Sequence, residues 1–221
     1  MGKLKAEWRT AINYIRDPYE PSLIEVETSN GRQKFRRLFQ VLLLDLLCML
    51  PLVALIGTIE QLGLVDLEDH ALRDALEQFP IWAIASFVII IGPFFEELIF
   101  RLHLSRRWNL IAGLMEWSTI AMEKVLRTEA AERVKAKWDR FYRWFFYLNA
   151  AAFALFHIMN FQAIDLPWWI VPLIVLPQFI AGLYFGYIRV KNGNMLWSVG
   201  LHALHNAILL APVLLFELPG Q

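Results

Sequence analysis

The 221-residue sequence has a single cysteine, Cys48, and charged residues make up only 19% of it. One cysteine cannot form a disulfide within the chain, which excludes a disulfide-stabilised secreted fold. The net charge is +0 at pH 7, so the overall charge gives no indication of nucleic-acid binding. A soluble domain has about 25% charged residues. The low charged fraction therefore argues against an ordinary soluble domain.

What the sequence has instead is long apolar runs. Hydrophobic residues make up 57% of the chain, and its mean hydropathy is +0.44. A helix that spans a membrane needs roughly 20 mostly apolar residues. Five runs are long enough, which predicts an all-α, polytopic membrane helix bundle with about five transmembrane helices. The runs are residues 38–59, 81 to beyond 100, 144–161, 168–188 and 195–216.

The basic residues are concentrated in three segments. Residues 1–37 carry eight Lys and Arg, residues 101–143 carry ten, and residues 189–191 carry two, which is 20 of the 21 in the chain. The segment 60–80 instead has six acidic residues and one arginine. Because short basic loops stay in the cytoplasm, we expect the N-terminus inside and the C-terminus outside.

The same pattern predicts the domain organisation. Residues 1–37 are expected to be a cytoplasmic segment with an amphipathic helix at the membrane interface. Residues 38–221 are expected to be a transmembrane catalytic domain. A charged cytoplasmic insert at about 108–143 interrupts that domain; its first part is expected to lie on the inner membrane surface, and the rest to continue as a solvated helix. The apolar stripe of the N-terminal helix is Leu4, Trp8, Ile12 and Ile15.

The segment FFEELIFRLHL places ionisable side chains inside an apolar run. Burying such groups in a membrane costs free energy, so each is expected to have a partner or a function. Glu97 and Arg101 are four residues apart, so they share a helix face and can neutralise each other. Glu96 points about a quarter-turn away and has no such partner on its own helix. The spacing thus favours Glu96 as a functional carboxylate, although it does not decide which of the two glutamates acts as a base.

Two further motifs place polar groups at i,i+4 spacing: Phe153 with His157, and His202 with Asn206. Each motif alone is weak, since a lone histidine on an apolar helix is usually a packing residue. Their depths agree, however. Counted from the predicted cytoplasmic helix ends, Glu96 lies roughly 15 Å deep, His157 roughly 20 Å, and His202 and Asn206 roughly 12–18 Å. We therefore expect one shared site near the middle of the bilayer.

The chemistry of such a site follows from its groups. A glutamate and a histidine that converge on one water can deprotonate it, and a second histidine with an asparagine suits a developing oxyanion. This combination can hydrolyse an amide without a nucleophilic Ser or Cys. Glu96, His157 and His202 could equally hold zinc, since two histidines and a glutamate form a known catalytic ligand set. His103, near the interface, and His205, which points elsewhere, are left out of the expected site.

The three motifs together resemble the three ordered motifs of the CPBP family, which includes CAAX prenyl proteases and bacteriocin-processing or immunity (Abi) proteins. The resemblance covers about residues 81–216. It implies an all-α membrane bundle that acts as an intramembrane endopeptidase on a membrane-embedded or lipid-anchored protein, in a bacterial or archaeal cell membrane. The motifs are Glu96-Glu97-x-x-x-Arg101, Phe153-x-x-x-His157 and His202-x-x-x-Asn206.

The resemblance also implies a role for each matched residue. Glu96 and His157 would activate the water, and His202 with Asn206 would stabilise the oxyanion. Supporting roles fall to Glu97, Arg101 and Phe153. No cofactor is then expected, and zinc is the alternative.

Two features depart from the family pattern. The family usually has glycine after the motif arginine, where this chain has Leu102, and the separation of Glu96 from His157 is larger than usual. The substrate cannot be assumed to be a prenylated C-terminus. Two other functions remain open, a non-catalytic membrane adaptor or immunity protein of the same fold and a proton-coupled transporter.

Overall fold

The computed structural model describes residues 2–19, 29–64, 75–76, 78–104, 129–160 and 168–216. All regular structure within these ranges is helical, as predicted. The predicted surface helix in the first part of the insert lies outside the described residues, whereas the later part is helical from Glu129 onward, as expected. The elements in chain order are α1 (Gly2–Arg16), α3 (Gly31–Gln61), α5 (Ile81–Ser86), the π-helix η1 (Phe87–Ile91), α6 (Gly92–Arg101), the 3-10 helix η2 (Leu102–Leu104), α8 (Glu129–Phe156), the 3-10 helix η4 (His157–Asn160), α9 (Val171–Asn192) and α10 (Met195–Phe216).

Three helical stretches in the described part of the chain are long and apolar enough to cross a membrane: Gly31–Gln61, Ile81–Leu104 and Val171–Asn192. They contain most of the first, second and fourth predicted spans. The third predicted span is the C-terminal part of α8, a helix that begins in the charged insert and ends at Phe156. The predicted total of five spans is therefore not confirmed.

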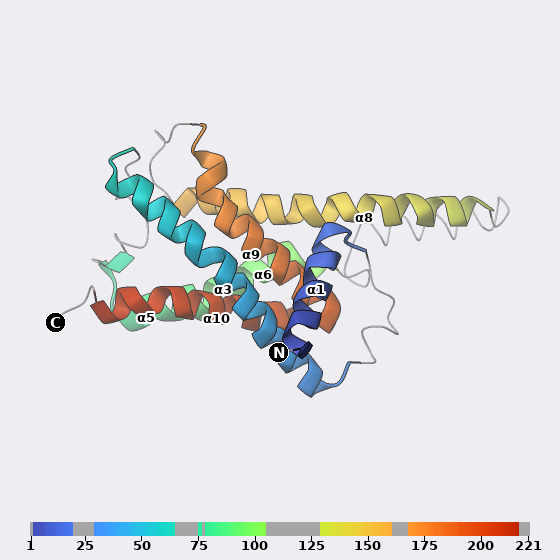
Figure 1. Ribbon diagram of the computed structural model, residues 1–221, viewed down its shortest axis with the longest axis horizontal. Coiled ribbons are helices and arrows are strands. Elements are labelled where there is room, and N and C mark those ends of the chain that lie inside the picture. The colour runs from blue at the N-terminus through green and yellow to red at the C-terminus, as the bar shows by residue number, and fades with distance from the viewer. Residues whose placement is uncertain are drawn as a thin grey trace.

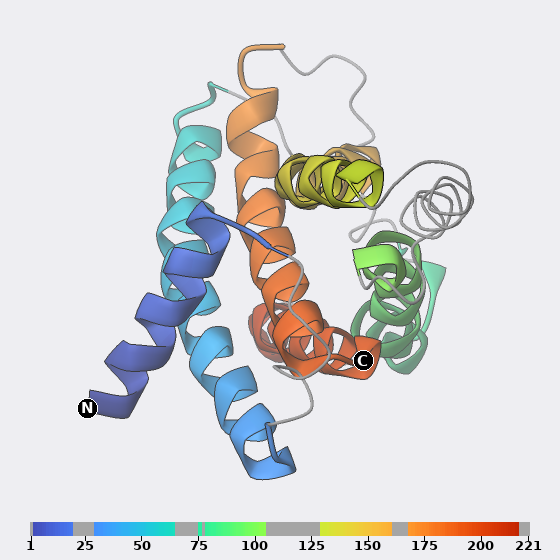
Figure 2. The same cartoon turned by 90° about the vertical axis from the view of Figure 1, so that its right-hand side faces the viewer.

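Helix α9 is the centre of the bundle. It contacts α1, α3, α8, α10 and α6, and α3 and α9 lie side by side with α1 packed on them (Figures 1 and 2). Its residues from Ala181 to Val190 are all buried. A helix that is apolar all round is suited to this central position. Helix α8 crosses α9 and extends well beyond the bundle at its N-terminal end (Figure 1).

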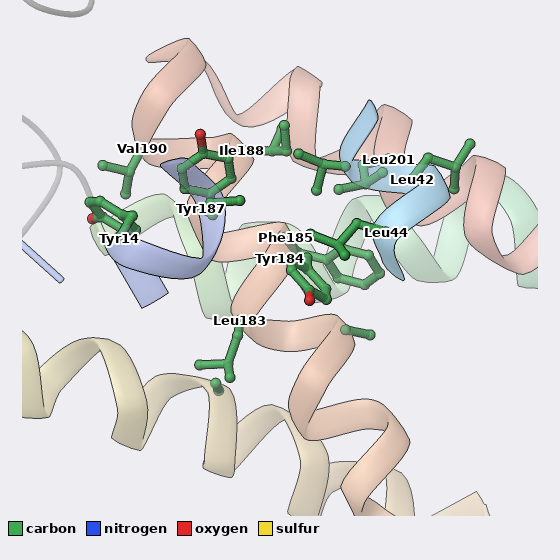
Figure 3. Close-up of a cluster of buried hydrophobic side chains, with 14 of the residues drawn as sticks. Tyr14, Leu42, Leu44, Leu183, Tyr184, Phe185, Tyr187, Ile188, Val190 and Leu201 are labelled. Carbon is green, nitrogen blue, oxygen red and sulfur yellow. The ribbon is translucent and has the colours of Figure 1, made fainter. Parts of the chain in front are cut away.

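The buried apolar core joins the elements around α9. Figure 3 shows Leu183, Tyr184, Phe185, Tyr187, Ile188 and Val190 of α9 together with Tyr14 of α1, Leu42 and Leu44 of α3, and Leu201 of α10. These side chains belong to one cluster. The core therefore fixes α1, α3 and α10 against the same helix.

The N-terminal helix packs on protein with part of its apolar stripe. Trp8 and Ile15 contact the core, while Ile12 is exposed. The indole nitrogen of Trp8 donates a hydrogen bond to the Gln40 carbonyl at 2.8 Å. Glu7, on the same helix, pairs with Arg37 of α3 at 3.0 Å. Helix α1 is thus attached to the start of α3 by both apolar and polar contacts.

Two glycines of α9, Gly182 and Gly186, bring α8 and α9 close together. A Cβ atom at Gly182 would lie 3.2 Å from Phe153, and one at Gly186 would lie 2.8 Å from Phe146. Helix α9 runs from Val171 to Asn192 and contains both Pro172 and Pro177. Pro172 lies in the first turn, where the missing N–H costs nothing.

We predict that Gly186→Ala destabilises the protein by about 1–3 kcal/mol, because the new methyl group overpacks the contact with Phe146. Unfolding in detergent, followed by circular dichroism, measures the change. Gly57→Ala in α3 is the matched control, because nothing lies within 4 Å of its added Cβ. Equal effects of the two substitutions would contradict the proposed close approach.

Candidate active site

Glu97 forms the most deeply buried part of the site. Its side chain is 0% exposed, and Oε2 lies 3.6 Å from Nε of Arg101, one turn along the same helix. Its other oxygen, Oε1, accepts a hydrogen bond from Nδ1 of His202 on α10 at 3.1 Å. The predicted pairing of Glu97 with Arg101 is confirmed, and the pair also orients a histidine on another helix.

Arg101 is held by groups from several helices. Its guanidinium carbon lies 4.0 Å from the centre of the Phe153 ring on α8, a cation–π contact. Nη2 donates to the carbonyl of Gly182 on α9 at 3.3 Å. Nε of Arg189, also on α9, donates to the Arg101 carbonyl at 3.1 Å, near the end of α6. The arginine thus joins α6, α8 and α9 around the paired glutamate.

Glu96 lies between two histidines from different helices. Its Oε2 is 3.5 Å from Nε2 of His157 and 3.8 Å from Nε2 of His202. These distances are longer than a good hydrogen bond, so neither imidazole bonds directly to this oxygen. The Glu96 side chain is 22% exposed, in contrast to Glu97. Glu96 is therefore the less buried of the two carboxylate side chains.

Hydrogen bonds fix how both histidines face Glu96. His157 follows the last residue of α8, and its Nδ1 lies 2.8 Å from the carbonyl oxygen of Phe153. Because a carbonyl oxygen only accepts, Nδ1 carries the proton and Nε2 faces Glu96. In His202, Nδ1 likewise donates to Glu97 and leaves Nε2 toward Glu96. Both rings therefore present the same type of atom to one carboxylate oxygen.

Asn206 is bound to an irregular part of the second membrane helix. Its Nδ2 donates to the Val88 carbonyl at 2.8 Å. Val88 lies in the π-helix, where the Gly92 N–H is bonded to Phe87, and the next residue, Pro93, has no N–H. The Val88 carbonyl thus lacks a donor from these two residues, and Asn206 satisfies it.

The structure brings together the residues expected at the site. Helices α6, α8 and α10 and the 3-10 helix η4 supply these residues. Helix α9 packs against α6, α8 and α10. His103 lies elsewhere, with Nε2 2.8 Å from Nδ2 of Asn149. The residues in the cluster are Glu96, Glu97, Arg101, Phe153, His157 and His202, with Asn206 one turn beyond His202 on α10.

The comparison with protein families matches residues 78–208 to the model described as Type II CAAX prenyl endopeptidase Rce1-like. The chain belongs to this family. Comparisons with curated proteins and with solved structures find no match. Family membership makes the chain an integral membrane protein of a protease family whose substrates are membrane-associated proteins.

The match to the Rce1-like endopeptidases contains every residue of the cluster but excludes α1 and α3. Leu102, where glycine is usual in the family, begins the 3-10 helix η2 and is only partly buried. The helix therefore tightens after Arg101 while the arginine keeps its contacts with α8 and α9.

One buried pair near this cluster is not predicted from the sequence. Nδ1 of His205 donates to Oδ2 of Asp45 on α3 at 2.5 Å. The expected site excludes His205, and no role is expected for Asp45. A signal was available, because each is an ionisable residue inside an apolar run and therefore needs a partner.

The donor atoms also bear on whether a metal fits. Among the residues that the structure describes, no group of three or more His, Cys, Asp or Glu side chains is arranged to hold a metal ion. Nδ1 of each site histidine is engaged by a hydrogen bond, and the Nε2 atoms face one oxygen of Glu96. We derive no step through zinc, and the zinc alternative stays a prediction.

We predict that Arg101→Met destabilises the protein by about 3–5 kcal/mol, because it leaves the Glu97 carboxylate buried without its cation. Chemical unfolding in detergent measures this. The double variant Glu97→Gln, Arg101→Met should recover much of the loss. Arg143→Met is the control: its pair with Asp17 is exposed, so its removal should cost less than about 1 kcal/mol. A small effect for Arg101→Met would contradict the buried pair.

Proposed function

We propose that the chain is an intramembrane endopeptidase in which Glu96 and His157 activate a water that attacks a peptide bond. The observation that carries the proposal is the position of Glu96 Oε2, 3.5 Å and 3.8 Å from the Nε2 atoms of His157 and His202. Three separate helices meet at this oxygen. Packing alone does not require a carboxylate and two imidazoles to converge there.

The choice between the two glutamates follows from their surroundings. Both oxygens of Glu97 face charged or hydrogen-bonding partners, Arg101 and His202. Among the described residues, Oε2 of Glu96 is buried without a hydrogen-bond partner. Oε2 of Glu97 also lacks one, but it faces the Arg101 guanidinium at 3.6 Å. A general base must be free to take a proton from water, so Glu96 is the base and Glu97 the supporting residue.

The proposed reaction has two proton transfers. Glu96 takes a proton from the water while the water oxygen bonds to the carbonyl carbon of the scissile amide. The carbonyl π electrons move to oxygen and form an oxyanion. When the C–N bond breaks, the proton held by Glu96 passes to the departing nitrogen, and the acid and amine products leave. His157 accepts a hydrogen bond at Nε2 and so orients the water toward the carbonyl.

The proposed oxyanion donors are His202 and Asn206. His202 already donates from Nδ1 to Glu97, so it can donate from Nε2 only as an imidazolium. Glu97, which also balances Arg101, stabilises that cation. Asn206 uses one of its two amide hydrogens on Val88 and keeps the second for the oxyanion. Preorganised donors of this kind account for a large part of catalysis in amide hydrolysis.

The proposed setting is a cell membrane of a bacterium or an archaeon, with five spans, the N-terminus inside and the C-terminus outside. The basic segments, which contain 20 of the 21 Lys and Arg residues, support this orientation. The substrate is a membrane-embedded or lipid-anchored protein. The charged insert then lies on the cytoplasmic side, away from the level of the catalytic groups.

Glu96→Gln and His157→Ala should each abolish cleavage, a loss of at least about 100-fold, because each removes a group that acts on the water. Comparison of membrane-protein termini in cells that express wild-type or variant protein measures this. His103→Gln is the control, because His103 hydrogen-bonds Asn149 outside the site. If Glu96→Gln complements a deletion strain fully, the chain is instead a non-catalytic adaptor.

Treatment with a strong chelator should leave cleavage unchanged, because the proposed mechanism uses only side chains and water. The measurement compares cleavage by purified protein in proteoliposomes before and after dialysis against 1,10-phenanthroline. Loss of activity that zinc restores would instead favour the set Glu96, His157 and His202 as zinc ligands.

A further inference from the structure

The buried contact between α3 and α10 has no part in the proposed chemistry. Asp45 is fully buried, and His205 is 8% exposed. Their hydrogen bond joins a helix outside the family match to the helix that carries His202 and Asn206. Ionisable groups are costly in an apolar bundle, and a buried pair often adds little net stability, which directs attention to what the pair positions.

Helix α10 has few features that can fix its rotation about its own axis. Its polar side chains before Pro212 are Ser198, His202, His205 and Asn206, apart from the indole of Trp197. Ser198 bonds to the Met195 carbonyl within the same helix and also hydrogen-bonds the Glu97 side chain on α6. Lipid tails are as apolar as leucine, so apolar burial does not strongly prefer one face of such a helix over another. The polar side chains of α10 must therefore supply much of the rotational preference.

His202, His205 and Asn206 attach α10 to its neighbours on two sides. His202 and Asn206 both bond to the helix that spans residues 81–104. His205 lies about 60° to one side of His202 around the helix, and Asn206 about 40° to the other. Without the bond to Asp45, α10 would be attached by polar bonds to one neighbour only. A rotation of about 20° would move side-chain ends by about 2 Å, enough to break the bond between His202 and Glu97.

A side chain of α9 links the two histidines. The Phe185 ring stacks on His202 with centroids 4.5 Å apart, and meets His205 edge-on at 5.7 Å. A shift of the His205 ring therefore reaches His202 through a buried contact as well as through the backbone.

We propose that Asp45 and His205 are a positioning pair that fixes the rotation of α10 and so holds His202 and Asn206 at the catalytic site. The inference rests on the proposed endopeptidase function. It assigns a role in the reaction to α3, which lies outside residues 78–208.

The double variant Asp45→Leu, His205→Phe separates positioning from stability. Replacement of a buried polar pair by apolar groups of similar size is often neutral for stability, but it removes the directional bond. Asp45→Asn is the conservative partner, because its amide oxygen can still accept the hydrogen of His205 Nδ1.

Cleavage is measured with the full chain in proteoliposomes, using an internally quenched peptide that ends in a farnesylated CAAX motif as the probe. The double variant should keep its melting temperature and KM within about twofold but lose about 10- to 100-fold in kcat, the range expected from a displacement of about 1 Å. Asp45→Asn should recover most of kcat. Wild-type kcat in a folded double variant would overturn the proposal.

Two further measurements separate this proposal from the proposed function. If Glu96→Gln cleaves the probe like wild type, the function fails. Nitrogen-15 NMR of labelled histidine then tests the positioning pair, because this measurement does not depend on cleavage. The same measurement applies if the wild-type protein does not cleave the probe. The His202 Nδ1–H resonance, assigned with His202→Gln, should lose its hydrogen-bonded shift in the double variant. An unchanged resonance would overturn the positioning role.

Discussion

The buried contact between Arg101 and Glu97 is the constraint around which the other elements are placed. A guanidinium in an apolar bundle needs a counter-charge and acceptors for its remaining N–H groups. Glu97 supplies the charge from the same helix, Gly182 supplies a carbonyl from α9, and Phe153 supplies a ring face from α8. Because Glu97 also binds His202, the requirements of one arginine bring four helices to the same point.

The close approach of α8 and α9 follows from that constraint. Arg101 reaches the Gly182 carbonyl only because no side chain stands between them; a Cβ at Gly182 would lie 3.2 Å from Nη2. The same absence lets Phe153 lie against both the arginine and α9. The short contacts at Gly182 and Gly186 therefore set how closely α8 approaches α9, and His157 follows α8 at the start of the next 3-10 turn.

The sequence was informative wherever the deciding interaction lies within one helix. The pairing of Glu97 with Arg101 and the shared face of Phe153 and His157 both depend on i,i+4 spacing. Contacts between helices were not predictable in the same way. Nothing local shows that His205 meets Asp45, or that Asn206 meets a carbonyl released by a π-helix. The number of spans was also uncertain, since α8 continues from a charged segment into an apolar one without a break.

Two neighbouring histidines on α10 are proposed to have different roles because of contacts that only the three-dimensional structure shows. His202 and His205 are both buried, and both donate from Nδ1 to a carboxylate. One carboxylate, Glu97, belongs to the helix that carries the proposed base, whereas the other, Asp45, belongs to a helix with no proposed catalytic group. The two histidine–carboxylate pairs are chemically alike, so the proposed roles differ because of what Nε2 of each ring faces. Nε2 of His202 faces Glu96, which is why the proposed chemistry uses His202, whereas the proposed role of His205 is to hold the helix in place.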